Sequence, residues 1–283
     1  MRKTGGLTFT VRYWIWNVGS RGLVRPDAPY ALLVNMNVSD IESTVIEKLL
    51  SLEQAETIEA QDRISREIAM LGEKAIPHLV SFTRRLPMKF SRLETVTHII
   101  DLMDYPKNRD GIPFLIDVIA NINHPGWETA VSTLKKIGDP IIPGIKKTIN
   151  YCLKDPDEYS PQIQGLCDFI ELLEPDMIRQ LIHDLLLLLE VGTDSNFVDY
   201  YALHPLIKIG SPDAELALPF IEMIIISERS EFLRAFSIRA LRHFDPKIVS
   251  AYTQIVEECL KVESIRIHDE AVLTLEWLKQ YMQ

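Results

Sequence analysis

The feature that most constrains this chain is a phrase that it repeats. The segment IGDPIIPGIKKTI at 137–149 closely resembles LGEKAIPHLVSF at 71–82, and their glycines lie 66 positions apart (138 minus 72). In both segments an apolar run ends at a glycine, and a proline follows within five residues. Glycine commonly ends helices and proline suits the first turn of the next one. Each phrase therefore predicts a tight turn between two helices.

The segments before such turns share one apolar face. The last apolar residue before each break recurs at intervals of 32 to 36 residues. These residues are Leu71, Met103, Ile137, Leu173, Ile209, Phe244 and Leu278. Counting back three positions gives a large aliphatic residue each time, and counting back seven gives mostly small or apolar residues. Because positions three and seven apart lie on one face of an α-helix, the pattern predicts seven helices with the same stripe.

A unit of about 35 residues, built as helix, Gly or Asp-Pro turn and helix, resembles HEAT-type repeats. The phrases LGEKAIPHL and IGDPIIPGI are most similar to the variant named after the phycobilisome-lyase group, and the resemblance covers roughly residues 54–283. It implies an all-α fold, an α-solenoid of about six antiparallel helix pairs in a right-handed superhelix with terminal capping helices. One pair cannot bury both of its faces, so neighbouring pairs must stack.

The breaks give the expected helix pairs. These are 54–71 with 73–86, 91–103 with 108–122, 126–137 with 139–154, 161–173 with 175–191, 196–210 with 212–227, and 230–243 with 245–262. A leading helix at 39–52, which begins with capping-box spacing, and a closing helix at 264–281 are expected at the ends.

The prolines refine these boundaries. Pro140, Pro175, Pro212 and Pro246 are expected at the first helical position, and Pro77, Pro113 and Pro143 near the fourth position of the second helices. Pro219 lies nine residues after Gly210 instead of five. We therefore expect either a longer turn or a kinked helix at Pro219.

The first 35 residues do not share the repeat, so the sequence divides into an irregular or disordered segment at 1–35 and a HEAT-like repeat domain at 36–283. The stretch LTFTVRYWIWNVGSRGLV favours a strand if it is ordered, but a lone strand is marginal in stability. Our expectation is that translation starts at Met36. The alternative is a basic, aromatic arm that touches a membrane surface or a partner.

Charge is unevenly placed along the chain. The net charge is −10, and residues 1–35 hold five basic side chains against one acidic. The remaining 248 residues therefore carry 25 basic and 39 acidic groups, a balance of −14. A body of this charge repels phosphate backbones, which disfavours nucleic-acid binding.

Cysteine usage and hydropathy bear on the compartment. Cys152, Cys167 and Cys259 have neither metal-ligand spacing nor the density of a disulfide scaffold, so we expect buried thiols in a reducing, cytoplasmic setting. The run LLLLL at 185–189 is bracketed by Asp184 and Glu190, and no stretch reaches the roughly 18–20 apolar residues of a membrane span. The N-terminus is a poor signal peptide.

Candidate chemistry is sparse. His268, Asp269 and Glu270 are adjacent, but neighbouring helix positions point about 100° apart and cannot aim at one ion. His183 and His204 are expected in packing or surface roles. A helical-repeat family of di-iron hydroxylases uses His-Glu dipeptides, and this sequence has none. No nucleophile, zinc or phosphate-loop motif occurs. We expect no catalytic residues, no metal, no cofactor and no enzymatic activity.

A partner-binding surface is the alternative to a reactive centre. In HEAT-like stacks the second helix of each pair lines the concave face, and the resemblance implies the same here. The candidate contact residues are Lys74, His78, Arg85, Arg109, Lys146 and Lys147, with acidic side chains following towards the C-terminus. Trp127, in the turn NINHPGWETA, is either an exposed anchor for the partner or a plug in the joint between consecutive repeats.

The leading hypothesis is therefore a non-enzymatic scaffold or adaptor that binds another protein in its concave groove. A bilin-lyase-like enzyme or chromophore chaperone follows only from the repeat variant. An immunity or inhibitor protein would use its acidic body against a basic toxin, and a DNA-glycosylase-like protein comes last because of the charge. The sequence identifies neither the partner nor the oligomeric state.

Overall fold

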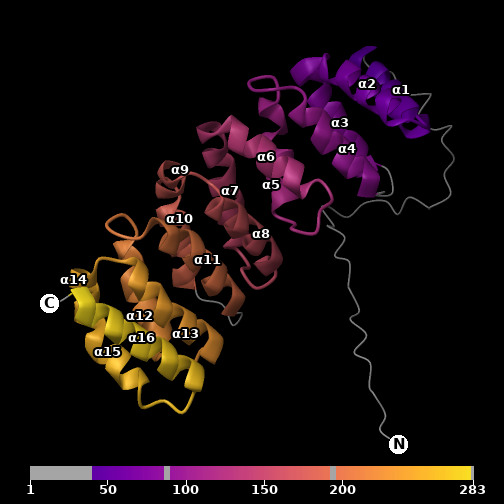
Figure 1. Cartoon of the computed structure of the whole chain (residues 1–283). Coiled ribbons are helices and arrows are strands. Elements are labelled where there is room, and N and C mark those ends of the chain that lie inside the picture. The colour runs from indigo at the N-terminus through magenta and orange to yellow at the C-terminus, as the bar shows by residue number, and fades with distance from the viewer. Residues whose placement is uncertain (1–39, 86–89, 192–195, 282–283) are drawn as a thin grey trace, which may run out of the picture. The chain divides into compact units, whose positions relative to one another are not determined.

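The repeated stripe forms the core of a two-layer helical stack. The computed structural model describes residues 40–85, 90–191 and 196–281, and these residues contain helices and turns without a strand. The expectations for residues 1–35, and for the start at Met36, lie outside the described residues. Figure 1 shows the described helices from residue 40 to residue 281 following one another in chain order from α1 to α16.

The helices that carry the stripe form one layer, called here the first-helix layer. They are α2 (Ile58–Ala69), α4 (Phe90–Asp101), α6 (Trp127–Ile137), α8 (Ser160–Glu171), α11 (Asn196–Ile209), α13 (Glu231–Ala240) and α16 (Ile265–Tyr281). In this layer α2 packs on α4, α4 on α6, α8 on α11, α11 on α13, and α13 on α16.

The other long helices form the second-helix layer. They are α1 (Asp40–Gln54), α3 (Ile76–Arg85), α5 (Ile112–Ile119), α7 (Ile142–Cys152), α10 (Ile182–Val191), α12 (Leu218–Ile226) and α15 (Thr253–Cys259). Each packs on the first-layer helix that follows it in the chain, so α1 pairs with α2 and α15 pairs with α16. The α-solenoid predicted from the repeat is confirmed. The predicted pairing was wrong in register, because each stripe helix packs mainly on the helix before it and not on the helix after it. The helices expected as end caps therefore belong to pairs, α1 with α2 and α16 with α15.

The stripe is buried as predicted. The residues three positions before each break have no exposed surface in the first six repeats: Ile68, Ile100, Leu134, Ile170, Leu206 and Leu241. The small residues seven positions before the break are equally buried: Ala130, Ala202, Ser237 and Ala271. Small side chains at these positions allow neighbouring helices to approach closely, and the aliphatic side chains fill the space between the layers.

The turns explain the glycines at three of the breaks and the aspartate that stands in the same place at a fourth. Gly72, Gly138 and Gly210 have φ between 62° and 72°, and Asp104 occupies the corresponding position with φ of 52°. Asp and Asn adopt this left-handed conformation more readily than most non-glycine residues. Asp104 thus ends the apolar segment of its repeat in the place of a glycine.

The prolines lie slightly differently from expectation. Pro77, Pro113, Pro143 and Pro219 are the second residues of α3, α5, α7 and α12, because a short 3₁₀ turn precedes each helix. The longer turn expected before Pro219 is confirmed. The prediction for Pro212 was wrong, because this residue lies in the turn after Gly210.

Two predicted second helices are interrupted. The segment 175–191 divides into α9 (Pro175–Arg179) and α10, and 245–262 divides into α14 (Pro246–Val249), a 3₁₀ turn and α15. In the second case the hydroxyls of Ser250 and Thr253 donate to the carbonyls of Lys247 and Ser250. Such local side-chain bonds compete with the helical ladder and favour a tight turn.

Candidate functional site

The predicted basic residues lie on or beside the second-helix layer. Lys74 and Arg109 are exposed in the 3₁₀ turns before α3 and α5, and Lys147 is exposed on α7. None of the described carboxylates forms an ion pair with these three side chains. Arg85 is the last residue of α3, and its side chain lies outside the described part of the chain.

Two of the predicted cations face carboxylates of their own chain. The ammonium nitrogen of Lys146 lies 3.6 Å from Oδ2 of Asp184, a buried residue of α10. Nδ1 of His78 lies 3.8 Å from Oε2 of Glu42 on α1. The helix α1 also belongs to the second-helix layer and carries several carboxylates, among them Asp40 and Glu42. The basic-to-acidic gradient from Lys74 onward stays a prediction.

Trp127 lies in the joint between repeats. It is the first residue of α6, it is half-buried against the core, and its indole N–H donates to the carbonyl of Ile119 at the end of α5 over 3.1 Å. In the same turn the amide of Gly126 donates to Nδ1 of His124. Burial lowers the pKa of His124 to about 4, so this ring accepts the bond in its neutral form.

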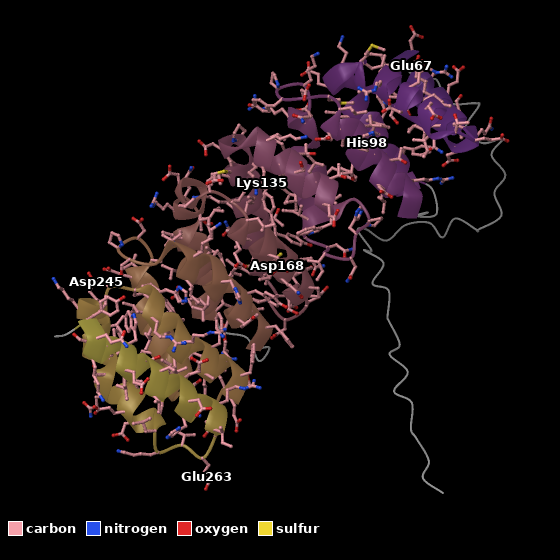
Figure 2. The ribbon with its side chains drawn as sticks, in the orientation of Figure 1. Glu67, His98, Lys135, Asp168, Asp245 and Glu263 are labelled. Atoms are coloured by element: carbon pink, nitrogen blue, oxygen red, sulfur yellow. The ribbon has the colours of Figure 1, made fainter. Side chains whose placement is uncertain are left out.

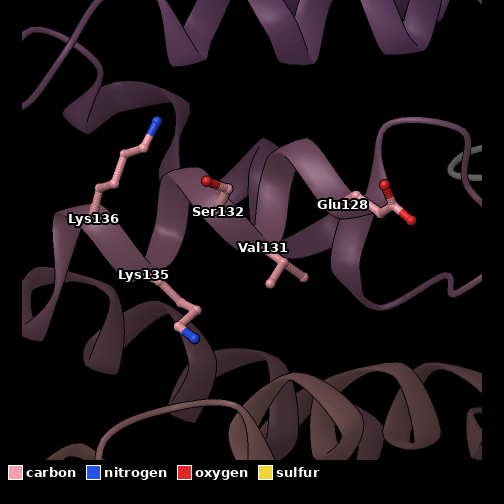
Figure 3. A pocket seen from close by; sticks show the side chains of 5 residues that line it. All are labelled: Glu128, Val131, Ser132, Lys135 and Lys136. Atoms are coloured by element: carbon pink, nitrogen blue, oxygen red, sulfur yellow. The ribbon is translucent and has the colours of Figure 1, made fainter.

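A shallow groove of about 480 Å³ runs along α6 and is lined by Glu128, Val131, Ser132, Lys135 and Lys136. Figure 3 shows Lys135 and Lys136 pointing to opposite sides of the helix. On one side of α6 lies the preceding first-layer helix, α4, which packs on α6. The next first-layer helix, α8, packs on α5 and α11 instead. Neighbouring residues of α6 therefore face different surroundings.

On the Lys136 side, a polar recess of about 340 Å³ separates α6 from the turn after α4. It is lined by Asp101, Asp104, Tyr105, Asn108, Thr133, Lys136 and Ile137. Oδ1 of Asp101 accepts hydrogen bonds from Thr133 at 2.8 Å and from Lys136 at 3.0 Å. Oδ1 of Asn108 is buried without a hydrogen-bond partner among the described residues.

An aromatic cluster covers part of α11 and α13. The ring of Tyr200 lies 4.5 Å from His204, 5.1 Å from Phe232 and 4.7 Å from Phe236, measured between centroids. The guanidinium of Arg239 lies 5.2 Å from the Phe236 ring, and that of Arg266 lies 5.7 Å from Phe232. The sequence reasoning missed this cluster. Aromatic residues separated by one helical turn and recurring one repeat later were the available signal.

Two carboxylates near this cluster have raised pKa values, the buried Asp199 and the half-buried Asp168. Burial raises the pKa of Asp199 to about 6, and Arg229, whose Nη2 lies 3.4 Å from Oδ2 of Asp199, opposes that shift. Burial and the neighbouring Glu171 raise the pKa of Asp168. Figure 2 labels Asp168 among charged side chains of both signs that are distributed along the stack.

The three cysteines are free and buried, as predicted. Burial raises the pKa of Cys152 to about 11, and burial with smaller contributions from Asp168 and Cys152 raises that of Cys167. Thiols of this kind are inert, because the thiolate is the reactive form.

The adjacent His268, Asp269 and Glu270 do not converge on one point. Nδ1 of His268 lies 3.6 Å from Asp269, whereas Glu270 accepts a hydrogen bond from Arg242. Across the described residues, no three His, Cys, Asp or Glu side chains are grouped so that they would hold a metal ion. None of the described helices combines the length and apolar content that crossing a bilayer requires.

Comparison with protein-family models and with curated proteins found no match. Among solved structures, the chain is similar to human deoxyhypusine hydroxylase in complex with glycerol, with 14% sequence identity and a TM-score of 0.29. The match covers 85% of this chain and 97% of that chain. So loose a superposition carries no argument about activity.

Proposed function

We propose that this chain is a non-enzymatic HEAT-like scaffold that binds a protein partner on the face of its second-helix layer. The observation that supports this proposal is the set of basic side chains on three successive repeats: Lys74, Arg109 and Lys147 are exposed and lack a described ion-pair partner. Repeat stacks offer extended surfaces of this kind, and unpaired charges on them contribute to the choice of partner and to the rate of association.

The neighbouring Lys146 belongs to the proposed surface but is a poor residue for testing it. Its ammonium group lies beside the buried Asp184, so reversing its charge would place two carboxylates together and destabilise the fold. The test therefore uses the exposed positions. The triple variant K74E/R109E/K147E keeps Lys146 and changes only side chains that lie outside the core.

The experiment is affinity capture from the native cell followed by mass spectrometry, with a matched triple reversal in the first-helix layer. R63E/K135E/K279E changes the net charge by the same amount on α2, α6 and α16. We expect wild type and this control to capture one stoichiometric protein that the K74E/R109E/K147E variant loses. Equal retention by both variants would show that the second-helix face is not the binding surface. Equal loss would show an effect of net charge alone.

The resemblance of the turns to the phycobilisome-lyase variant makes a separate prediction. A protein that handles a bilin would shift the absorption spectrum of added chromophore. A flat spectrum removes that alternative and leaves the scaffold proposal unchanged.

A further inference from the structure

The polar recess between α4 and α6 contains a buried side chain whose hydrogen-bonding capacity is not used. Asn108 is 2% exposed, lines the recess, and its Oδ1 has no hydrogen-bond partner among the described residues. Buried amide groups are almost always paired, and leaving one unpaired costs about 1–3 kcal/mol. Because Asn108 lines the recess of about 340 Å³, its unused acceptor indicates a ligand that brings a donor.

The other polar groups of the recess are also mainly acceptors. Asp101 and Asp104 contribute carboxylates. The single hydroxyl hydrogen of Thr133 lies within reach of Oδ1 of Asp101 at 2.8 Å and of the carbonyl oxygen of Thr129 at 2.7 Å, so it is used within the protein. The one cation among the lining residues is Lys136, and its side chain is 64% exposed. Lys136 therefore neutralises Asp101 from the solvent side and is free to turn away when another cation enters. Lys107 and Arg109, in the same turn, do not line the recess.

We propose that this recess binds a guanidinium group, in which one N–H reaches Oδ1 of Asn108 and others reach the carboxylates of Asp101 and Asp104. Guanidinium has five donors in a planar fork, is weakly hydrated, and stacks on aromatic rings. Tyr105, which is 46% exposed at the rim, offers such a ring. Two carboxylates and one amide oxygen fall short of the six to eight oxygens that Ca²⁺ prefers.

The source of the guanidinium is an arginine of the protein partner, and this part of the inference rests on the proposed function. The chain carries a net charge of −10, which attracts a basic partner over long range. A recess in which a single arginine is desolvated gives such a partner a fixed anchor, because arginine is enriched among the residues that dominate interface energies.

The test measures binding of N-acetyl-arginine amide by NMR titration of the full chain. N-acetyl-citrulline amide, which has the same shape without the charge, is the ligand control. D104N and N108L should each weaken arginine-amide binding about tenfold, since each removes a hydrogen bond that involves a charged group. Asn at 104 tolerates the positive φ of that residue. Unfolding curves of both variants show that any loss of binding is not a loss of fold.

Lys136 gives the sharpest result. K136M removes the competing ammonium group, so arginine amide should bind several-fold more tightly. K135M, on the opposite side of α6 and outside the lining of the recess, should leave the affinity unchanged (Figure 3). Weaker binding by K136M would mean that Lys136 supports binding of the ligand instead of competing with it, and would overturn the proposal. Equal binding of the citrulline compound, or no binding of arginine amide, would also overturn it.

An eight-residue peptide with one arginine distinguishes the two sources of the ligand. Tighter binding of the peptide than of arginine amide supports a protein source, and equal binding identifies a free small molecule. The proposal of a guanidinium site can be overturned without overturning the scaffold proposal. Partner capture that depends on Lys74, Arg109 and Lys147 is measured in a separate experiment.

Discussion

The indole N–H of Trp127 donates a hydrogen bond of 3.1 Å to the carbonyl oxygen of Ile119, across the turn that joins α5 to α6. The same oxygen faces α8, where a Cβ built on Gly165 would lie 2.4 Å from it. Three helices therefore meet at one peptide group. Because α5 packs on both α6 and α8, this junction connects two sets of first-layer helices, one that ends at α6 and one that begins at α8.

Replacing Trp127 with Phe should destabilise the protein by about 1–2 kcal/mol. Phenylalanine retains most of the apolar contact but leaves the carbonyl of Ile119 without its indole donor. Urea unfolding gives the free-energy change. A change below about 0.3 kcal/mol would show that water satisfies this carbonyl equally well.

Replacing Gly165 with Ala should cost about 1–3 kcal/mol or more, despite the higher helix propensity of alanine. The added methyl group would meet the backbone of Ile119 and Ala120, which cannot turn away as a side chain does. Gly144 in α7 is the matched control, because its added Cβ would meet the terminal carbon of the Ile116 side chain. We expect G144A to lose clearly less stability than G165A in the same unfolding measurement.

Replacing Ser237 with Ala should stabilise the protein by about 1 kcal/mol. Ser237 is fully buried in α13, and its hydroxyl has no hydrogen-bond partner among the described residues. The same stripe position holds Ala130, Ala202 and Ala271 in other repeats. Alanine removes the cost of the unpaired hydroxyl and leaves the helix spacing unchanged. A raised melting temperature with unchanged circular dichroism would support this prediction, and a lowered one would contradict it.

The core could be predicted from the sequence, whereas the recess could not. Ile68, Ile100 and Leu134 recur with the repeat period, so their shared burial follows from helix geometry alone. The recess depends on how far the turn after α4 lies from α6, and no local pattern encodes that distance. The role of Asp104 could not be predicted for a different reason, because its left-handed backbone conformation is taken by a glycine at the breaks of three other repeats.

The buried carboxyl of Asp199 should make stability depend on pH. Its folded-state pKa of about 6 lies above the ordinary value of 3.8, because burial outweighs the attraction of Arg229. A group with a raised folded pKa favours folding fully below its unfolded pKa, and this contribution is lost as pH rises through the folded pKa. Asp199 therefore becomes increasingly unfavourable between about pH 4 and pH 6, and its cost is constant above that range.

The variant D199N removes this titration while retaining the shape of the side chain. At pH 7 we expect D199N to be more stable than wild type by about 1–3 kcal/mol. The loss of the ion pair between Asp199 and Arg229 reduces this gain. The advantage should shrink as pH falls from 7 to 4, because the wild-type carboxyl becomes protonated and neutral. Comparing the two proteins at each pH cancels the other titrating groups they share. An advantage that grows towards acid would mean that Asp199 is held as a carboxylate by Arg229.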